Sequence, residues 1–316
     1  MAEPGLESDL TWPESTWERS VPLPDLDRAF LERHLGPWPE LLALEPLRLG
    51  GGLRSVVIRL GDVVARIGPA ATVAKEAAIH RLVGERVRVA KVVDTRPGVL
   101  LLEHVPHEPL PPTPEAGRAA GRSAARIHAF ALEEAGMLSP TLEIEEAFPS
   151  ALDGLRGWAE GLLEGLAGSR LGPAAARVRA LWDAHELEMR DVSREPVLTH
   201  ADYKPVNLKW LPDAGHALGG RVLVLDWEFA WSGAAIFDAG MLMRWDPPEP
   251  FVRGFEEGCR DEGAPLPRGW RRMAMLFDLF NLVGFLGQEG ERRRRDADLL
   301  RRVRETLRVM GEAPKS

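Results

Sequence analysis

Four polar side chains stand in a stretch that begins and ends with apolar residues, LTHADYKPVNLKW at positions 198–210. His200, Asp202, Lys204 and Asn207 fall within eight positions, with a proline among them. A carboxylate can orient or deprotonate a hydroxyl, an ammonium can place positive charge beside a phosphoryl group, and an amide oxygen can bind a hard cation such as Mg²⁺. The spacing therefore predicts a loop that grips a metal-bound phosphate and directs a hydroxyl towards it.

Asp226 is a second acidic residue with a place in this chemistry, because it follows the apolar run VLVL. The run predicts a strand that ends at Asp226 and holds its carboxylate on a rigid element. A hairpin between 207–210 and 221–226 would bring Asn207 and Asp226 together. Both are oxygen donors that suit Mg²⁺, so we expect these two residues to bind the metal and Asp202 to accept a proton from the hydroxyl.

A run of glycines, Gly50, Gly51 and Gly52, lies between two predicted strands, and Ser55 follows shortly after it. Glycine lets backbone N–H groups approach phosphates without side chains in the way. We therefore expect this loop, with Ser55, to cover the phosphates of a nucleotide. Glycine turns between strands are also common without any ligand.

Arg66 and Glu76 are the next candidates for phosphate binding. Arg66 falls on a predicted strand and Glu76 on the predicted helix that follows it. An arginine on a strand paired with a glutamate on a helix would clamp the α- and β-phosphates. The alternative is an ordinary arginine at a strand edge.

The elements that must position these residues fall into two parts, of which the first is rich in β-branched residues in alternation. Three strands are expected within 46–68, and a further pair within 87–105 is joined at a proline-glycine turn. Helices are expected over 23–36, with Asp25 or Asp27 as N-cap and Gly36 as its end, and over 72–85. The first part is therefore predicted to be a mostly antiparallel sheet with one main helix.

The second part follows a proline-rich connector and is mainly helical. Expected helices lie near 114–134, 148–168, 173–188, 237–244, 249–262, 268–288 and 291–310. The hairpin described above is the one expected interruption. We therefore predict an α+β fold of two lobes, with a nucleotide-binding lobe over 1–105, including a leading extension and helix over 1–44, and a helical lobe over 106–316 that carries the catalytic loop and the acceptor site.

Composition limits the class of protein and its partners. The 316 residues carry a formal net charge of −8, so we expect no nucleic-acid partner. Cys259 is the only cysteine, no secretory segment is evident at the N-terminus, and no apolar run is long enough to span a bilayer. We expect a cytoplasmic protein, a monomer or homodimer, that acts on a small molecule.

Three motifs taken together resemble a known family. HADYKPVN, then VLDWE, then FDAG are similar to the aminoglycoside phosphotransferase and choline kinase-like family, which shares the protein-kinase fold. The resemblance covers roughly residues 45–290 and implies ATP and Mg²⁺ as cofactors. It also implies roles for individual residues: Asp202 as catalytic base, Asn207 and Asp226 as metal ligands, Asp238 as a structural aspartate behind the catalytic loop, His200 as a structural partner, and the backbone of Glu103, His104 and Val105 as the adenine contact.

The chain departs from the family pattern at two positions. Arg66 stands where relatives usually have lysine, and arginine is wider and forked. Lys204 lies where many small-molecule members have histidine and where protein kinases have a phosphate-contacting lysine. A plain surface lysine is the alternative for Lys204, and His128 is interpreted as a packed helix histidine.

Acceptor recognition is expected from the helical lobe. The stretch WRRMAMLFDLFNLVGFLG is apolar on almost all faces, and its interior polar exceptions are Asp278 and Asn281, three positions apart and so on one face. A carboxylate in an apolar helix needs a partner or access to solvent. We interpret the pair as a substrate contact, with a hydrogen bond to a neighbouring helix as the alternative.

The sequence thus predicts a phosphotransferase that moves the γ-phosphate of ATP to a hydroxyl of a small molecule, such as an amino alcohol, a sugar or glycated amine, or an aminoglycoside. One alternative is a kinase-like protein that binds nucleotide without transfer. Another is a protein kinase, although only eleven residues separate Asp226 from Asp238, which leaves little room for an activation segment.

Overall fold

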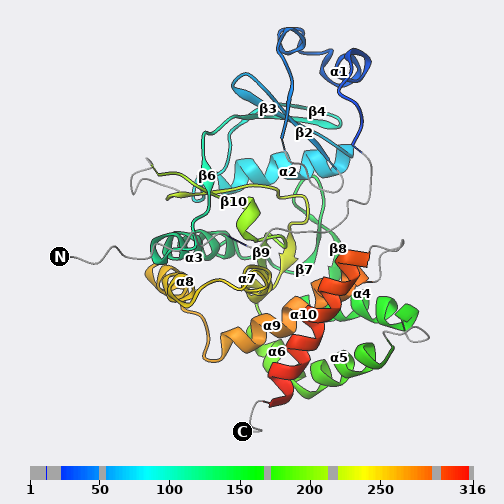
Figure 1. The fold of residues 1–316 in the computed structure, drawn as a ribbon, viewed down its shortest axis with the longest axis vertical. Helices are drawn as coiled ribbons and strands as arrows, with labels where there is room; N and C mark the ends of the chain where they lie inside the picture. The colour runs from blue at the N-terminus through cyan, green and yellow to red at the C-terminus, as the bar shows by residue number, and fades with distance from the viewer. Residues whose placement is uncertain are drawn as a thin grey trace, which may run out of the picture.

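The structure is a computed structural model that describes Trp12 and residues 23–49, 55–166, 172–212, 220–286 and 293–312. An antiparallel sheet with a helix beside it forms one end of the molecule, and a larger, mainly helical part forms the other (Figure 1). The predicted two-lobed α+β fold is confirmed. The predicted loop of Gly50, Gly51 and Gly52 lies outside the described residues.

The N-terminal sheet has the order β1-β2-β3-β5-β4, and all neighbouring strands are antiparallel. Gly61 and Gly98 form the tight turns between β2 and β3 and between β4 and β5, with φ of 60° and 82°, a conformation that glycine adopts without strain. The strands are β1 Leu47–Arg48, β2 Val56–Leu60, β3 Val63–Ile67, β4 Val92–Arg96 and β5 Val99–Glu103.

The leading helix α1, Arg28–Leu35, is followed by the short 3-10 helix η1, Leu41–Ala43. The Asp27 carboxylate accepts a hydrogen bond from the amide of Phe30. This side chain satisfies one of the amides that the first turn of a helix leaves unpaired. The structure therefore selects Asp27 from the two predicted caps.

Helix α2, Ala70–Val83, contacts both lobes. Val73 and Ala77 pack in a small apolar cluster with residues of the sheet. Ile79 and Val83 belong to the large apolar core of the helical part. Figure 1 shows α2 between the sheet and the rest of the chain, so its side chains can connect the sheet to the helical part.

The helical part differs from prediction in where its helices end. The helix expected over 114–134 stops at His128, and the helix expected over 173–188 is divided in two at His185. Within the described residues, no helix is long and apolar enough to cross a membrane. The helices are α3 Pro114–His128, α4 Ala151–Leu166, α5 Gly172–Ala184, α6 Glu186–Val192, α7 Ala235–Met243, α8 Glu249–Asp261, α9 Trp270–Leu286 and α10 Arg293–Glu312.

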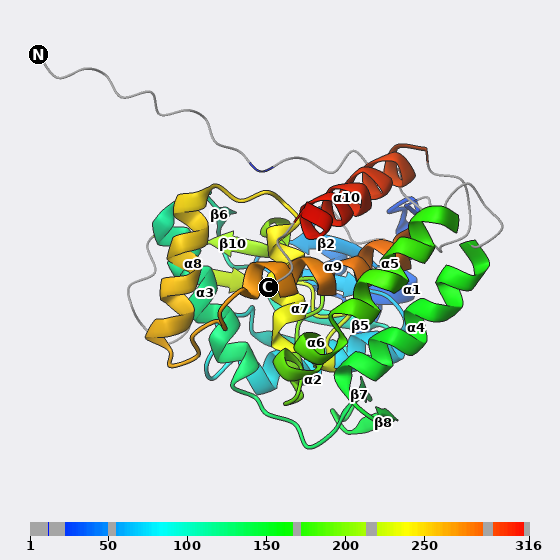
Figure 2. The same ribbon diagram turned by 90° about the horizontal axis from the view of Figure 1, so that it is seen from below.

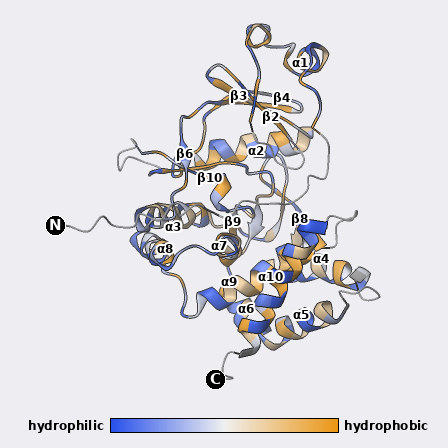
Figure 3. Cartoon of the chain, in the orientation of Figure 1, coloured by the Kyte–Doolittle hydropathy of each residue, from blue (hydrophilic) through white to orange (hydrophobic). Residues whose placement is uncertain are grey.

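Helix α10 is amphipathic. Hydrophilic and hydrophobic residues alternate along the helix in Figure 3. Its buried positions include Leu299, Val303 and Leu307, spaced four apart on one face. The arginine-rich face is therefore the solvated side of an amphipathic helix.

A four-stranded sheet in the helical part was not predicted. Its order is β8-β7-β12-β9. Only the hairpin of β10 and β11 was expected, and it is present, with Leu208 opposite Val224. The expected strand ends at Val224, so Asp226 lies two residues beyond it. The strands that follow the N-terminal sheet in the chain are β6 Glu108–Pro109, β7 Ala135–Leu138, β8 Ile144–Phe148, β9 Val197–Thr199, β10 Leu208–Trp210, β11 Val222–Val224 and β12 Trp231–Gly233.

Helices α3 and α8 pack with their backbones in contact, side by side in both Figures 1 and 2. Gly117 and Gly121 on α3 face Gly254 and Gly258 on α8. A Cβ atom at any of the four would lie 2.1 Å from a backbone oxygen of the other helix, so the approach requires glycine at all four positions. The spacing of these glycines, four positions apart on each helix, is visible in the sequence and could have predicted the close approach of the two helices.

Candidate active site

Asp238, in the first turn of α7, holds the start of the catalytic loop. Its carboxylate accepts hydrogen bonds from the amides of His200 (2.9 Å) and Ala201 (2.8 Å). Ala201 has φ of 62°, a left-handed conformation that costs about 1–2 kcal/mol outside glycine and persists where surrounding contacts fix it. His128 on α3 also contacts Asp238, with Nε2 at 2.9 Å, so this histidine has a polar partner that sequence reasoning missed.

The imidazole of His200 joins the two halves of the site. The amide of Asp202 lies 3.2 Å from Nδ1, and Nε2 lies 3.0 Å from the carbonyl oxygen of Leu225. Because the amide donates to Nδ1, the ring proton must be on Nε2, where it can donate to Leu225. A neutral His200 thus connects the catalytic loop to the residue before Asp226.

Asp202 is buried, with one carboxylate oxygen held and the other unbonded. Oδ2 lies 2.8 Å from Nζ of Lys204 and 2.8 Å from Nδ2 of Asn207. Oδ1 makes no hydrogen bond to any residue in the part of the chain that the structure describes. Burial raises the pKa of Asp202, and the positive charge of Lys204 acts in the opposite direction. Lys204 is therefore engaged with Asp202 and is not a plain surface lysine.

Arg66 lies at the centre of the second half of the site. Its Nε is 2.6 Å from Glu76 Oε2, and its Nη2 is 2.7 Å from Asp226 Oδ1 and 3.0 Å from Glu228 Oε2. Only 7% of the arginine side chain is exposed. Burial raises the pKa of Glu76 to about 7, against the opposite effect of Arg66. The predicted pair of Arg66 and Glu76 is present, within a cluster of three carboxylates.

Glu228 is a site residue that sequence reasoning missed. It contacts Arg66, and Ser55 Oγ lies 3.5 Å from its Oε2. The available signal was its place two residues after Asp226 in the VLDWE motif. Ser55, predicted to cover nucleotide phosphates, is buried against this carboxylate.

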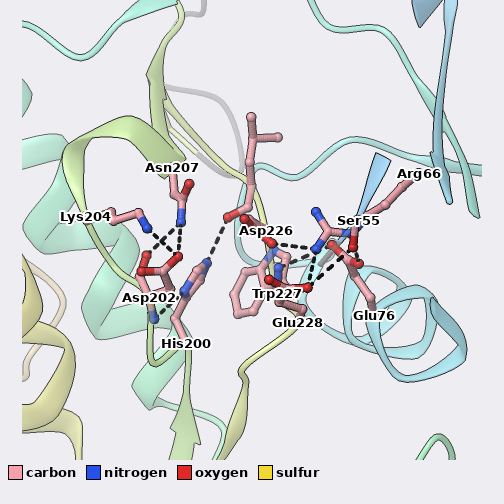
Figure 4. A network of polar contacts seen from close by, with 11 residues as sticks. Ser55, Arg66, Glu76, His200, Asp202, Lys204, Asn207, Asp226, Trp227 and Glu228 are labelled. Carbon is pink, nitrogen blue, oxygen red and sulfur yellow. Dashed lines mark hydrogen bonds and ion pairs between the residues drawn. The ribbon is translucent and has the colours of Figure 1, made fainter. Parts of the chain in front are cut away.

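Figure 4 shows the two halves side by side. Asp202, Lys204 and Asn207 lie on one side of His200, whereas Arg66, Glu76 and Glu228 lie on the other with Asp226 nearest the loop. The amide of Leu225 donates to the carbonyl oxygen of Asn207 (2.9 Å), which brings the two predicted metal ligands next to each other in the hairpin.

The predicted adenine contact is partly occupied by the protein itself. The amide of Glu103 donates to the carbonyl of Lys91 (2.9 Å), and the amide of His104 donates to the carbonyl of Asp62 (2.8 Å). These two amides are therefore not free for a base. The other backbone groups of Glu103, His104 and Val105 remain candidates, and the adenine contact around these residues stays a prediction.

Asp278 has a protein partner in the neighbouring helix region. Its carboxylate oxygens lie 2.9 and 3.0 Å from Nε of Arg244, at the end of α7, and the pair is buried. Burial raises the pKa of Asp278, while Arg244 lowers it. Asn281 makes no side-chain hydrogen bond through Nδ2 within the described chain. The pairing with Arg244 fits the alternative of a partner in a neighbouring helix, and a contact of Asp278 with substrate stays a prediction.

Comparisons with known proteins identify the family of the chain. The sequence profile of the phosphotransferase enzyme family matches residues 44–276. A search of curated proteins found no match.

Solved structures of similar fold include three small-molecule phosphotransferases or kinase-family proteins. A candidate fructosamine-3-kinase of Thermobifida fusca has a TM-score of 0.63 at 19% identity, over 90% of this chain and 98% of that chain. A choline/ethanolamine kinase family protein of Mesorhizobium loti has a TM-score of 0.59 at 19% identity, over 91% and 94%. The ADP-bound aminoglycoside phosphotransferase APH(2'')-Ib has a TM-score of 0.65 at 13% identity, over 89% and 99%. At these identities the likeness shows the fold alone.

Proposed function

Because the chain belongs to the phosphotransferase enzyme family, we propose that it transfers the γ-phosphate of ATP to a hydroxyl of a small molecule in a magnesium-dependent reaction. The observation that carries the proposal is the hydrogen bonding of the Asp202 carboxylate. Lys204 and Asn207 fix one carboxylate oxygen, and the other is unbonded within the described chain. Such a carboxylate is oriented to accept the proton of a hydroxyl, and its raised pKa makes it a stronger base.

The donor atoms of Asn207 and Asp226 fit Mg²⁺. Asn207 uses its amide nitrogen on Asp202, so the amide oxygen is left for another partner. Asp226 uses Oδ1 on Arg66 and retains Oδ2. No group of three or more His, Cys, Asp or Glu side chains in the described ranges could hold a metal by itself. This matches an ion that one or two protein oxygens share with waters and phosphates, where it neutralises phosphate charge.

Arg66 is placed to bind nucleotide phosphates while it remains paired. Its Nε and Nη2 contact carboxylates, and in Figure 4 the other terminal nitrogen is turned away from them. That nitrogen can donate to a phosphate oxygen. Because the guanidinium is planar and rigid, the contacts of Nε and Nη2 also fix the direction of this donor. Lys204, bound to Asp202, can place its charge beside the transferred group.

A small acceptor is the class that the chain supports best. Eleven residues lie between Asp226 and Asp238, and β12 and α7 take up most of them, so little chain is left to bind a peptide. Amino alcohols, sugars, glycated amines and aminoglycosides are the acceptors to test. A silent nucleotide-binding protein is the alternative, against which the intact Asp202, Asn207 and Asp226 argue.

The test is turnover of nucleotide with each class of acceptor. Release of nucleoside diphosphate should depend on both acceptor and Mg²⁺, and both ATP and GTP should be tried as donors. A protein substrate such as casein serves as the comparison for protein kinase activity. Binding of nucleotide by calorimetry, without turnover on any of these acceptors, would favour the silent alternative.

A further inference from the structure

Lys75, on α2, has no part in the reaction as described above. Its Nζ donates a hydrogen bond of 3.0 Å to the carbonyl oxygen of Ala230, 155 positions later. Five of the 40 basic residues of the chain are lysines, and this one is partly buried next to Glu76. Partial burial of an ammonium group costs free energy, and its hydrogen bonds must offset that cost. The hydrogen bond of Lys75 goes to a backbone carbonyl far away in the sequence, so it ties two segments together.

The segment that Lys75 contacts carries two carboxylates of the site, Asp226 and Glu228. The amide of Trp227 lies 3.3 Å from Oε1 of Glu76, and the amide of Ala230 donates to the carbonyl of Trp227 (3.1 Å). Two adjacent residues of α2 therefore hold both ends of the turn. Asp226, just before the turn, has φ of 67°, a strained conformation that surrounding contacts must maintain.

The charges around Lys75 connect it to the same cluster. Burial lowers the pKa of Lys75, and the carboxylates of Glu228, Glu76 and Glu145 act in the opposite direction. Glu228 and Glu76 are also the carboxylates that contact Arg66. The ammonium thus supplies a second positive charge where one guanidinium faces three carboxylates.

We propose that Lys75 is a positioning residue, which holds the segment 226–230 on α2 through the carbonyl of Ala230 and so fixes the direction of the Asp226 and Glu228 carboxylates. Its consequence for phosphoryl transfer rests on the proposed function, whereas the contact itself is a property of the ligand-free protein. A purely electrostatic role predicts the opposite effect on metal binding. Loss of a positive charge beside Glu76 and Glu228 would strengthen the binding of a cation at the cluster, whereas loss of position would weaken it.

The first experiment uses Lys75→Met, which keeps the length of the side chain and removes its charge and hydrogen bond. Lys91→Met is the matched control, because Lys91 is an exposed lysine of the same lobe. Amide hydrogen exchange of the ligand-free proteins should be about tenfold faster over residues 226–233 in Lys75→Met and unchanged in the control. Equal exchange in both variants would overturn the proposal.

The second experiment measures ATP binding by calorimetry, with and without Mg²⁺, well below the melting temperature. We expect Lys75→Met to weaken binding about tenfold with Mg²⁺ and less than about twofold without it. Lys75→Arg, which can still donate to Ala230, should recover part of the loss. Unchanged or tighter binding with Mg²⁺ would overturn the proposal. If the parent protein binds no magnesium nucleotide, the proposed function fails, and the exchange result still decides whether Lys75 holds the segment.

Discussion

The catalytic loop and the Arg66 cluster lie side by side and are built in opposite ways. The loop takes Asp202, Lys204 and Asn207 from a short run of sequence, and their side chains contact one another. The cluster joins β3, α2 and the segment after β11, and its Arg66–Asp226 pair spans 160 positions. The contacts of Asp202 with Lys204 and Asn207 are therefore local, although Asp238 of α7 holds the start of the loop, whereas the contacts of Arg66 depend on the packing of both lobes.

The two regions also differ in charge. Asp202 meets one ammonium, so the pair is balanced. Arg66 meets three carboxylates, and Lys75 adds one further positive charge nearby. The cluster therefore gathers three carboxylates around one guanidinium, and Asp226 is one of them. Under the proposed function, the loop would direct the acceptor and the cluster would bind a metal nucleotide.

The largest effect is expected from Asp202→Asn, which tests the loop alone. The amide keeps nearly the same shape but loses the ability to accept a proton, so kcat should fall by roughly 10²–10⁴-fold. The Kd for ATP should change little, because the Arg66 cluster is untouched. Steady-state kinetics on an accepted substrate, with calorimetry on the same preparation, measures both quantities. A variant within a few-fold of the parent in kcat would remove Asp202 as the base.

The next effect is expected from Asp226→Asn, which tests the cluster. The substitution removes an anionic oxygen from a hard cation, so binding of ATP with Mg²⁺ should weaken by about ten- to a hundredfold. Binding without metal should be nearly unchanged. Paired calorimetric titrations decide the point, and Asp94→Asn on β4, outside the Arg66 cluster, serves as the control substitution. Equal losses with and without Mg²⁺ would contradict the metal role.

The burial of Glu76 should appear as a dependence of stability on pH. Burial raises the pKa of Glu76 to about 7 in the folded protein, above its ordinary value of 4.5. Between these values the folded state binds more protons than the unfolded state, so the free energy of unfolding falls as the pH rises. Glu76→Gln should reduce this fall, by an amount on the order of 1–3 kcal/mol. Urea denaturation of both proteins near pH 5 and near pH 7 measures the difference. An equal fall in the free energy of unfolding for the parent and for Glu76→Gln would contradict the raised pKa of Glu76.

The smallest effect is expected from Tyr203→Phe in the catalytic loop. Tyr203 is the only tyrosine of the chain, is fully buried, and donates a hydrogen bond of 2.7 Å to the carbonyl of Ala120 on α3. The loss should lower the free energy of unfolding by about 1 kcal/mol and leave kcat within a few-fold, because the contacts of Asp202 are local.

A spectroscopic measurement on the parent protein checks the same point. Burial raises the pKa of Tyr203, so tyrosinate absorbance should appear only as the chain unfolds in alkali. Ionisation of Tyr203 in the folded protein would contradict the burial of its hydroxyl group against α3.

Local patterns explain most of what could be predicted about the fold. The cap at Asp27, the turn at Gly98 and the hairpin of β10 and β11 involve neighbouring residues, so their sequence carries the signal. The sheet of β7, β8, β9 and β12 was missed because its strands are short and some of their partners are distant. Trp231 pairs with Thr199 across 32 positions, and short strands of this kind have no helical or alternating run long enough to reveal them.

The site residues show the same difference between local contacts, which were predicted, and distant contacts, which were missed. The closeness of Asp202, Lys204 and Asn207 follows from their spacing, while their roles in transfer stay a prediction. Glu228 and Lys75 were missed because their partners come only from the packing of β3 and α2 against the segment after β11. Asp278 was interpreted as a substrate contact because an apolar helix does not reveal that Arg244 meets it from α7.

The sequence by itself determined the family, the two-lobed α+β fold and the set of residues in the catalytic loop, because motifs, caps and short turns are contacts within a few positions. The tertiary structure alone decided which carboxylates surround Arg66, which arginine binds Asp278, and how closely α3 and α8 approach through their four glycines. Those contacts join segments far apart in the chain. Their partners are chosen by packing and by the pairing of buried charge, which no single stretch of sequence specifies.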